Sequence, residues 1–516
     1  MRVSVVDLGF NSVKMASYAV EKDGTFKAYH QEAAKVRLGE GLERTGYLGR
    51  EQVQRAIEAL KLFRDIINFD SVKHVLPVAT SAVREAGNRE DFLKQVYEQT
   101  GFQFRVLSNY EEAFYSYVGA LQAICVPTAL FFDIGGGSLE LVYTENYTIK
   151  KVKSYPLGAL RLAQAFGSGD GTFSKKAYDR LDRHIRDALP DKKELGLSVD
   201  TVLVGVGGVL RALARRNQEL TGYELDKVHN YQLSYDSMSS MAKDLHRMDA
   251  GELSKVEAVG ANRTETIVAG STVISVLMDR LGFDGITVSA RGLREGILSV
   301  FARDPKTYYS GGINNEKVKG YVAFACQRET LPQYTFTLVK PLVAAGLLRE
   351  KEKAILTHAI KEMAGLPAIT NYSNLFHLMM DEDNAFLTHR EQLILALAIV
   401  HSRKDKVAGM LFSRYRSILE PQNMKSVKKI SACLALSAIL EKSKAAARLS
   451  IVTSSGKQQQ TTTVVNIKLV PGRQFLPFAL LASALKNFEG AFNVSVACQV
   501  VAATGSKQHE ATRVIA

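Results

Sequence analysis

The feature that most constrains the fold is a repeated unit, in which an apolar strand runs into Asp-x-Gly and a second strand returns. Residues 3–6 lead into Asp7-Leu8-Gly9, and residues 129–132 lead into Asp133-Ile134-Gly135, 126 positions later. A separation of this length indicates gene duplication rather than a solenoid, so the repeat predicts a duplicated α/β domain. A third strand, residues 201–204, runs into glycines ahead of a predicted helix.

The net charge of +13 belongs entirely to the last two-fifths of the chain. Residues 1–300 hold 38 basic and 38 acidic side chains, whereas residues 301–516 hold 28 basic and 15 acidic ones. An apolar content of 46% excludes a disordered chain, and the length predicts roughly three or four domains. The sequence therefore predicts a neutral N-terminal part and a basic C-terminal extension.

Neither a membrane anchor nor a secretion signal is expected. No run approaches the roughly 20 apolar residues of a membrane helix, and Asp7 interrupts the apolar stretch that a signal peptide would need. The four cysteines are scattered without a C-x-x-C pair, which argues against a disulfide scaffold or a Cys-rich zinc site. We expect a cytoplasmic protein that does not bind membranes.

The strongest local motif is Asp133-Ile134-Gly135-Gly136-Gly137-Ser138-Leu139-Glu140. Consecutive glycines after a strand let the backbone turn its N–H groups toward an anion. Asp133 can hold a hydrated divalent cation at the strand end, and Glu140 can share that cation or orient a water. The alternative is a glycine-rich hairpin with two surface carboxylates.

Two further loops match this motif in chemistry. In Asp7-Leu8-Gly9-Phe10-Asn11-Ser12, Asp7 can face the same metal while Asn11 and Ser12 offer donors to a phosphate. Gly207-Gly208, ahead of a helix, form a third potential phosphate site at a helix N-terminus. The chain has no Walker-type P-loop, so any phosphate chemistry is of another kind.

Three charged residues have a local structural explanation that competes with a functional role. Glu111 and Glu112 open a predicted helix, where acids usually serve as solvated partners of the helix dipole. Beside a phosphate site, one of them becomes a candidate general base for water. Arg84 follows a strand and can clamp a phosphate, although a surface ion pair fits its local sequence equally well.

Taken in order, these motifs resemble the exopolyphosphatase/guanosine pentaphosphate phosphatase family of the long exopolyphosphatase type, which belongs to the actin-like superfamily. The resemblance spans residues 1–300. The matching segments are Asp7–Ser12, Arg37-Leu38-Gly39, Ala79–Arg84, Glu111-Glu112-Ala113, Asp133–Glu140, Gly205–Gly208, Asn262-Arg263-Thr264 and Gly292-Leu293-Arg294-Glu295-Gly296.

The resemblance implies that water attacks the terminal phosphate of a chain and releases orthophosphate, without a phosphate bound covalently to the enzyme. It makes Glu112 the catalytic base and makes Asp7, Asp133 and Glu140 ligands of Mg²⁺ or another divalent cation such as Mn²⁺. The phosphate contacts that it implies are Gly9, Asn11, Ser12, Arg84, Gly135, Gly136, Gly137, Ser138, Gly207, Gly208 and Arg263.

The chain departs from the family pattern at a few positions. Phe10 replaces a usual Ser, Leu139 a usual Thr and Val209 a usual Thr, and Asn109 stands where Gly is common. None of these changes removes an acid. We expect activity, with a substrate preference that Phe10 and Leu139 can alter.

The resemblance also divides the chain. It implies α/β architecture with two actin-like, ribonuclease-H-like domains at 1–125 and 126–305, a helical HD-like domain at 317–450 and a small α+β domain at 451–516. A linker is expected over residues 303–318, a helix over 428–448 and a polar loop over 454–462. Because the chain contains no His-Asp dipeptide, we expect the helical domain to lack the HD metal motif and catalytic activity.

The sequence leaves several functions open. The first is a metal-dependent exopolyphosphatase acting on inorganic polyphosphate. The second removes the terminal phosphate of guanosine pentaphosphate (pppGpp), with the tetraphosphate as a related partner. The third is a non-catalytic polyphosphate or nucleotide sensor, against which the retained acids argue. A homodimer is compatible with the resemblance, but the sequence does not determine the oligomeric state.

The basic extension favours the long polymer, because a line of Lys and Arg can release the counterions of a polyphosphate chain. Aromatic residues are not interleaved with these bases, which disfavours nucleic acid. A solvated basic surface is the alternative. The candidate positions are Arg403, Lys404, Lys406, Lys425, Lys428, Lys429, Lys442, Lys444 and Arg448.

Overall fold

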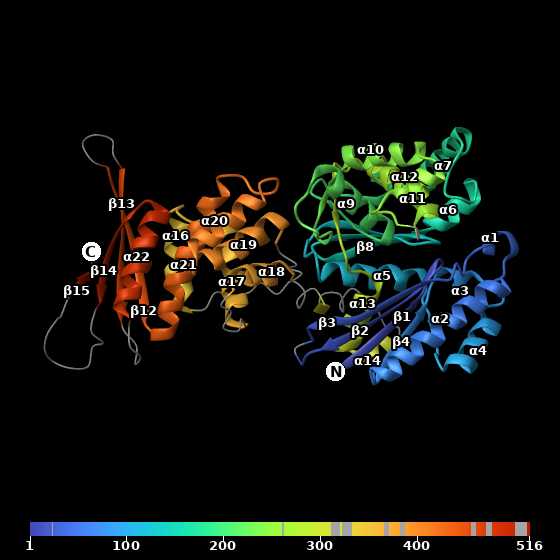
Figure 1. Cartoon of the computed structure of the whole chain (residues 1–516), viewed down its shortest axis with the longest axis horizontal. Coiled ribbons are helices and arrows are strands. Elements are labelled where there is room, and N and C mark those ends of the chain that lie inside the picture. The colour runs from blue at the N-terminus through green and yellow to red at the C-terminus, as the bar shows by residue number, and fades with distance from the viewer. Residues whose placement is uncertain are drawn as a thin grey trace. The chain divides into compact units, whose positions relative to one another are not determined.

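The computed structural model describes residues 1–22, 24–260, 263–310, 320–321, 333–365, 371–381, 387–455, 461–470, 477–500 and 513–515. The chain divides into two compact units, Met1–Gln327 and Arg328–Ala516. Each unit has its own sheets and helices (Figure 1). None of the described helices combines the length and the apolar composition that crossing a bilayer requires.

The first sheet of the N-terminal unit has the strand order β3-β2-β1-β4-β5. Its strands are β1 (Arg2–Leu8), β2 (Ser12–Val20), β3 (Phe26–Lys35), β4 (His74–Ala79) and β5 (Arg105–Val106). The expected helical face of α2 (Arg50–Phe69), which carries Ile57, Leu60 and Phe63, packs into a core with residues of β1 and β2. The other helices of this part are α1 (Leu42–Thr45), α3 (Ser81–Glu85) and α4 (Arg89–Thr100).

The second sheet has the order β10-β11-β9-β6-β7-β8. Its strands are β6 (Ala129–Ile134), β7 (Leu139–Glu145), β8 (Thr148–Tyr155), β9 (Val202–Val206), β10 (Gln232–Ser234) and β11 (Gly285–Val288). The associated helices are α6 (Ala159–Phe166), α7 (Lys175–Ala188), α8 (Lys192–Leu195), α9 (Gly208–Thr221), α10 (Tyr235–Arg247), α11 (Ala250–Lys255) and α12 (Thr264–Leu281).

The two sheets repeat one topology. Without β10, the order β8-β7-β6-β9-β11 reproduces β3-β2-β1-β4-β5. In both sheets the first three strands form antiparallel pairs and the last two are added in parallel. This repetition confirms the predicted duplication of an α/β domain. Asp7 and Asp133 therefore occupy equivalent places, near the ends of β1 and β6.

Two helices lie between the sheets, α5 (Asn109–Leu121) and α13 (Leu293–Arg303) (Figure 1). Helix α5 contacts the strands of the second sheet, and α13 contacts both α5 and β1. They meet backbone to backbone, since a Cβ on Gly296 would lie 1.8 Å from the Tyr115 carbonyl oxygen and one on Gly119 would lie 2.0 Å from that of Gly292. This close packing fixes α5, the helix that carries Glu112, beside the second sheet.

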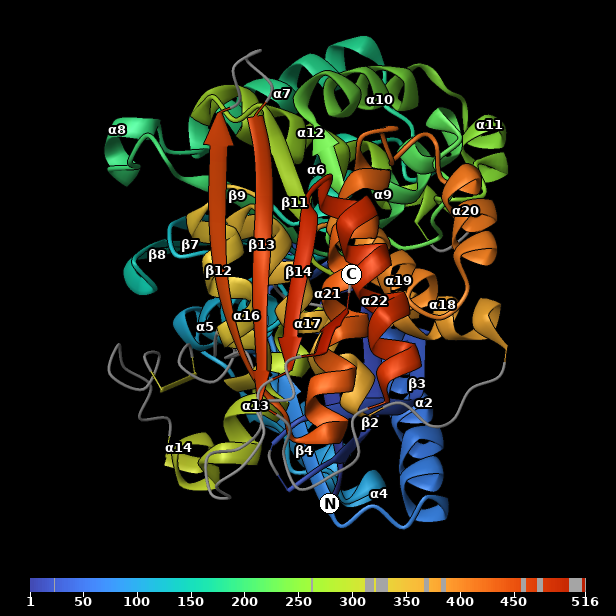
Figure 2. The same cartoon turned by 90° about the vertical axis from the view of Figure 1, so that its left-hand side faces the viewer.

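The C-terminal unit combines a helical part with a four-stranded sheet of order β12-β13-β14-β15. Figure 2 shows β12, β13 and β14 side by side. The helices are α16 (Gln333–Ala344), α17 (Glu350–Gly365), α18 (Tyr372–Asp381), α19 (His389–His401), α20 (Asp405–Arg414), α21 (Asn423–Ser443) and α22 (Phe478–Phe492). The strands are β12 (Ala446–Ser455), β13 (Thr461–Val470), β14 (Ser495–Val500) and β15 (Arg513–Ile515).

Several local expectations were wrong in their bounds. The helix expected over 428–448 ends at Ser443, and β12 begins at Ala446, so the boundary expected at 450/451 falls inside a strand. Residues 454–455 and 461–462 of the expected loop are strand, and 456–460 lie outside the described residues. The expected linker begins with α14 (Pro305–Ser310), and its residues 311–318 are not described.

The described cysteines are in two states. Cys125 is disulfide-bonded, whereas Cys433 and Cys498 are free and buried. The scattered spacing of the cysteines did not predict a disulfide.

Candidate active site

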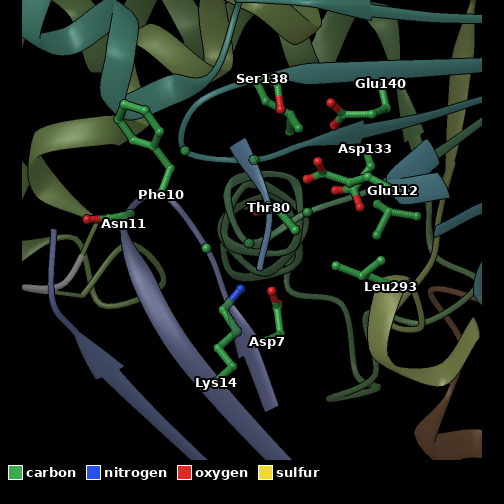
Figure 3. Close-up of a pocket in the computed structure, with 18 of the residues that line it drawn as sticks. Asp7, Phe10, Asn11, Lys14, Thr80, Glu112, Asp133, Ser138, Glu140 and Leu293 are labelled. Carbon is green, nitrogen blue, oxygen red and sulfur yellow. The ribbon is translucent and has the colours of Figure 1, made fainter. Parts of the chain in front are cut away.

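A cleft of about 130 Å³ opens where loops of the two sheets meet. Figure 3 shows carboxylates of both sheets and of α5 pointing into it. Most of the sequence-predicted site residues line this cleft, namely Asp7, Gly9, Asn11, Ser12, Glu112, Asp133, Gly135, Gly136, Gly137, Ser138, Glu140, Gly207 and Gly208. The cleft lining does not include Arg84 or Arg263.

The first two loops make the same turn. The Gly9 N–H donates to the Ser12 carbonyl at 3.0 Å, and the Gly135 N–H donates to the Ser138 carbonyl, also at 3.0 Å. In the described part of the first loop, the buried Oδ1 of Asn11 has no hydrogen-bond partner. A carboxamide oxygen is an acceptor, so the partner that it lacks would be a hydrogen-bond donor or a cation.

Helix α6 orients the glycine loop. The Ala159 N–H donates to the Gly135 carbonyl, and the N–H groups of Leu160 and Arg161 donate to the Gly136 carbonyl, each at 3.0 Å. In a trans peptide the C=O and the following N–H point in opposite directions. Carbonyls drawn toward α6 therefore turn the next N–H groups of the loop away from α6, where an anion can accept them.

The third loop starts α9. Gly207 has φ of 129°, a conformation that side chains rarely adopt, and α9 begins at Gly208. The first N–H groups of a helix lack intrahelical partners and attract anions. A Cβ on Gly208 would lie 3.5 Å from Nε of Arg263. Arg263 therefore flanks the N-terminus of α9, where it can add positive charge to a phosphate site.

The paired acids at the start of α5 have separate roles. Ser108 and Glu111 form a capping box, and Glu111 also pairs with Arg105. Glu112 instead lines the cleft. The local sequence does not distinguish the two acids, because both lie in the same first turn.

Glu112 is held by Arg84, whose Nη1 donates to Oε2 of Glu112 and to the Leu107 carbonyl, each at 2.8 Å. Burial raises the pKa of Glu112 to about 7, together with repulsion from Asp133 and Asp7 and against the attraction of Arg84. A carboxylate with a pKa near neutrality can take a proton from water. Arg84 thus contacts Glu112 in this structure and does not line the cleft itself.

The other three carboxylates are also crowded. Burial raises the pKa of Asp133, which accepts a hydrogen bond from the Ser116 hydroxyl. Burial and repulsion from Glu112 and Asp133 raise the pKa of Glu140 well above its usual range. Burial also raises the pKa of Asp7, despite the attraction of Lys14. Carboxylates placed in this way gain stability when a cation joins them.

The described residues contain no group of three or more His, Cys, Asp and Glu side chains arranged to hold one metal ion. The predicted trio is thus not a preassembled cage. Its chemistry still fits Mg²⁺, which proteins often bind through one or two carboxylates together with substrate phosphates and water. The crowding of Asp133, Glu140 and Glu112 at the cleft is the observation that supports this fit.

Sequence reasoning gave no role to three cations that line the cleft. Lys14 lies opposite Asp7 in the β1–β2 register, and its pKa is lowered by burial and by Arg294 and Arg211. Arg211 also donates to the Ala290 carbonyl at 3.0 Å. The only signal for Arg294 was its place in the Gly292–Gly296 motif. Packed together near Asp7 and Asp133, these cations can balance a chain of phosphates.

Phe10 is buried, with 3% of its surface exposed. A Cβ on Gly39 would lie 2.3 Å from its ring and one on Gly137 would lie 2.5 Å from it, so the ring fills a notch between these two glycines. The change from the usual Ser thus joins the first loop to the glycine loop by an apolar contact.

Comparisons with known proteins agree with this geometry. The model of the Ppx/GppA phosphatase family matches residues 18–302. Exopolyphosphatase 2 of Mycobacterium tuberculosis is 27% identical over 312 residues, covering 57% of this chain and 97% of that protein. A bifunctional 3-dehydroquinate synthase/phosphatase of Fusobacterium nucleatum is 27% identical over 303 residues, covering 55% of this chain and 44% of that protein.

A solved structure gives the same result for the fold. The crystal structure of an exopolyphosphatase from Cytophaga hutchinsonii is 25% identical, has a TM-score of 0.54 and covers 59% of this chain and 98% of that one. The family model covers more than half of the chain and includes Glu112, Asp133, Glu140 and both later glycine loops. The chain belongs to the Ppx/GppA phosphatase family.

Proposed function

We propose that the chain is an exopolyphosphatase, which hydrolyses the terminal phosphoanhydride bond of inorganic polyphosphate and releases orthophosphate. The observation that carries this proposal is Glu112, a carboxylate with a pKa of about 7 in a cleft that three glycine loops line. The exopolyphosphatases among its relatives support the same reaction.

In this mechanism the terminal phosphate lies against the loop N–H groups. Glu112, oriented by Arg84, takes a proton from the water that attacks phosphorus, and the bond to the bridging oxygen breaks. Lys14, Arg211 and Arg294 offset the negative charge that the shortened chain retains. No covalent phosphoenzyme is needed, because a base and a bound water suffice.

A divalent cation is part of the proposal. Asp7, Asp133 and Glu140 are the residues that would hold it, directly or through water. Such a cation would supply charge stabilisation to the phosphate oxygens and so complement the loop donors. Because the structure already places Lys14 near Asp7 and Asp133, this side chain can stabilise their charge in the absence of a cation.

The second candidate substrate is guanosine pentaphosphate, which offers the same terminal phosphoanhydride bond. The cationic side of the cleft favours neither substrate by itself. We propose polyphosphate as the main one, because the C-terminal unit carries the exposed basic residues Arg403, Lys404, Lys406, Lys425 and Lys428. Nδ1 of His401 lies 3.0 Å from the hydroxyl oxygen of Ser431, so the C-terminal end of α19 lies beside the part of α21 that carries Lys428.

We propose that this unit is a non-catalytic, HD-like helical domain with a small α+β cap and that it binds the polymer. The four-stranded sheet with α22 is compatible with such a cap. A cytoplasmic location and a homodimer are also part of the proposal, on the resemblance alone.

The proposal can be tested by orthophosphate release in the presence of Mg²⁺. The full chain is given long-chain polyphosphate or guanosine pentaphosphate, with Glu112→Gln as the control for contaminating phosphatases. We expect release from polyphosphate with a higher kcat/KM than from the nucleotide. Release from the nucleotide alone would support the second candidate. Binding without release from either substrate would support a sensor.

A further inference from the structure

A short helix, α3, connects the catalytic base with the opposite half of the cleft. Arg84 of α3 holds Glu112 at 2.8 Å. The next residue, Glu85, accepts a hydrogen bond from Nη2 of Arg161 at 2.5 Å. Arg161 belongs to α6, which packs beside the glycine loop of the second sheet. Helix α3 is thus linked to Glu112 through Arg84 and, through Glu85 and Arg161, to the helix beside the glycine loop.

The Arg161 side chain makes contacts that a surface ion pair would not need. Its Nε donates to the Gly137 carbonyl at 2.8 Å, and its guanidinium lies 5.3 Å from the centroid of the Phe10 ring. Only 9% of the Arg161 side chain is exposed, against 41% of Glu85. Arginine suits this position, because its planar group presents donors in several fixed directions.

The bond to Gly137 completes a series. Backbone N–H groups of α6 hold the carbonyls of Gly135 and Gly136, and the Arg161 side chain holds the next carbonyl, that of Gly137. The Gly137 carbonyl shares a planar peptide with the Ser138 N–H, which must point the other way. Ser138 lines the cleft, whereas Arg161 does not. The arginine therefore turns the Ser138 N–H toward the substrate side.

We propose that Arg161 is a positioning residue: it sets the orientation of the Ser138 N–H and, through Glu85, the position of the glycine loop relative to Glu112. It touches neither substrate nor water in this role. The inference rests on the proposed phosphatase function. According to this inference, a single side chain orients the Ser138 N–H, the last donor of the glycine loop. Backbone N–H groups of α6 orient the two preceding donors, the N–H groups of Gly136 and Gly137.

The test compares three variants of the full chain. Arg161→Met removes the donors but keeps much of the length. Glu85→Gln removes the ion pair but leaves the Nε–Gly137 bond in place. Arg161→Lys keeps a cation for Glu85 but has no planar fork to serve both acceptors. Arg186→Met is the matched control, because Arg186 forms half-exposed ion pairs with Asp182 and Asp279 on the same half of the unit.

A misplaced donor in a phosphoryl-transfer site weakens the transition state more than the ground state. We expect Arg161→Met to lower kcat for polyphosphate by about 10- to 100-fold, below the full loss of one preorganised donor, with KM changed by less than about threefold. Glu85→Gln should lower kcat by less than about threefold, and the kcat of Arg161→Lys should lie between those of Arg161→Met and Glu85→Gln. The kcat of Arg186→Met should equal that of the wild type. The acidic limb of the pH profile should not move in any of them, because the Arg84–Glu112 pair is intact.

Three results would overturn the inference. They are a kcat for Arg161→Met close to that of the wild type, equal losses for Arg161→Met and Glu85→Gln, or a shifted acidic limb. If Arg161→Met fails to fold by circular dichroism, the order of Arg161→Lys and Glu85→Gln decides the question. A wild type that releases no phosphate would instead refute the proposed function, so the two failures remain distinguishable.

Discussion

Replacing Arg84 by Met separates two roles that the sequence could not distinguish. As a phosphate clamp, Arg84 would contribute mainly to substrate binding. In the structure its guanidinium contacts Glu112 and the Leu107 carbonyl, and its attraction is the largest influence that opposes the raised pKa of Glu112. Removing the charge should therefore raise the pKa of Glu112 further.

The size of the effect follows from the burial of the pair. The side chains of Arg84 and Glu112 are 17% and 12% exposed, so solvent screens them only in part. Two unit charges about 4 Å apart interact by roughly 4 kcal/mol at an effective dielectric constant near 20. Water that enters the space of the missing guanidinium and relaxation of the site reduce this loss. We therefore take about 2–3 kcal/mol for the lost attraction, which corresponds to roughly two pKa units.

A pKa that rises from about 7 by two units reduces the ionised fraction of Glu112 at pH 7 from about one half to about 1%. We expect kcat/KM for polyphosphate to fall roughly 50-fold at pH 7 and to recover most of this loss above about pH 9, because the base must be ionised to accept a proton. The assay is orthophosphate release across the pH range at saturating Mg²⁺.

Arg89→Met is the control, because Arg89 pairs with Glu90 at the exposed start of α4 and should leave the profile unchanged. The reasoning is wrong if Arg84→Met raises KM equally at every pH and leaves the acidic limb in place. That outcome would assign Arg84 to the phosphate, as the sequence suggested.

Three further predictions concern the glycines, the cations and the basic unit. Gly296→Ala places a Cβ 1.8 Å from the Tyr115 carbonyl and should destabilise the N-terminal unit by about 3 kcal/mol, measured by thermal unfolding. The control is Gly409→Ala, whose Cβ meets nothing within 4 Å and should not destabilise the chain. Equal melting points for the two variants would contradict the close packing of α5 and α13. Lys14→Met should raise KM for polyphosphate about tenfold or more at low Mg²⁺, because Lys14 supplies positive charge beside Asp7 and Asp133. The increase in KM should be smaller at high Mg²⁺. The same increase at both Mg²⁺ concentrations would refute this role. Deleting residues 328–516, the whole C-terminal unit, should selectively lower activity on long polyphosphate chains and weaken the dependence of that activity on salt. The variant must keep α14, since Tyr308 is buried in the core of the N-terminal unit. Unchanged long-chain kinetics would rule out polymer binding by the basic residues of the C-terminal unit.

Local sequence was enough to predict the two glycine loops, because a strand that ends in Asp-x-Gly constrains its own turn. The strand repeat then predicted the duplicated sheet, which the five-strand order common to both sheets confirms. The local sequence was not enough to predict which of Glu111 and Glu112 faces the cleft. Both acids occupy the first turn of α5, and only the capping box and the packing of α5 on α13 decide which one faces the cleft.

The residues that the sequence did not identify depend on long-range contacts. Lys14 reads as an ordinary polar position of β2, and only the register with β1 brings it to Asp7. Arg161 lies on a helix with a strongly amphipathic pattern, yet its side chain is used to hold the carbonyl of a loop 24 positions earlier. Such roles cannot be read from periodicity, because they depend on which elements are in contact: β1 with β2 for Lys14, and α6 with the glycine loop for Arg161.

The central claim is that Glu112, and not its neighbour, is the base in the hydrolysis of polyphosphate. The direct measurement is orthophosphate release by Glu112→Gln and Glu111→Gln, together with polyphosphate binding by each variant. Gln can replace Glu in a capping box, so Glu111→Gln should keep nearly full activity. Glu112→Gln should lose about 10²- to 10⁴-fold in kcat and still bind the polymer. Normal turnover by Glu112→Gln, or an equal loss in both variants, would contradict the account.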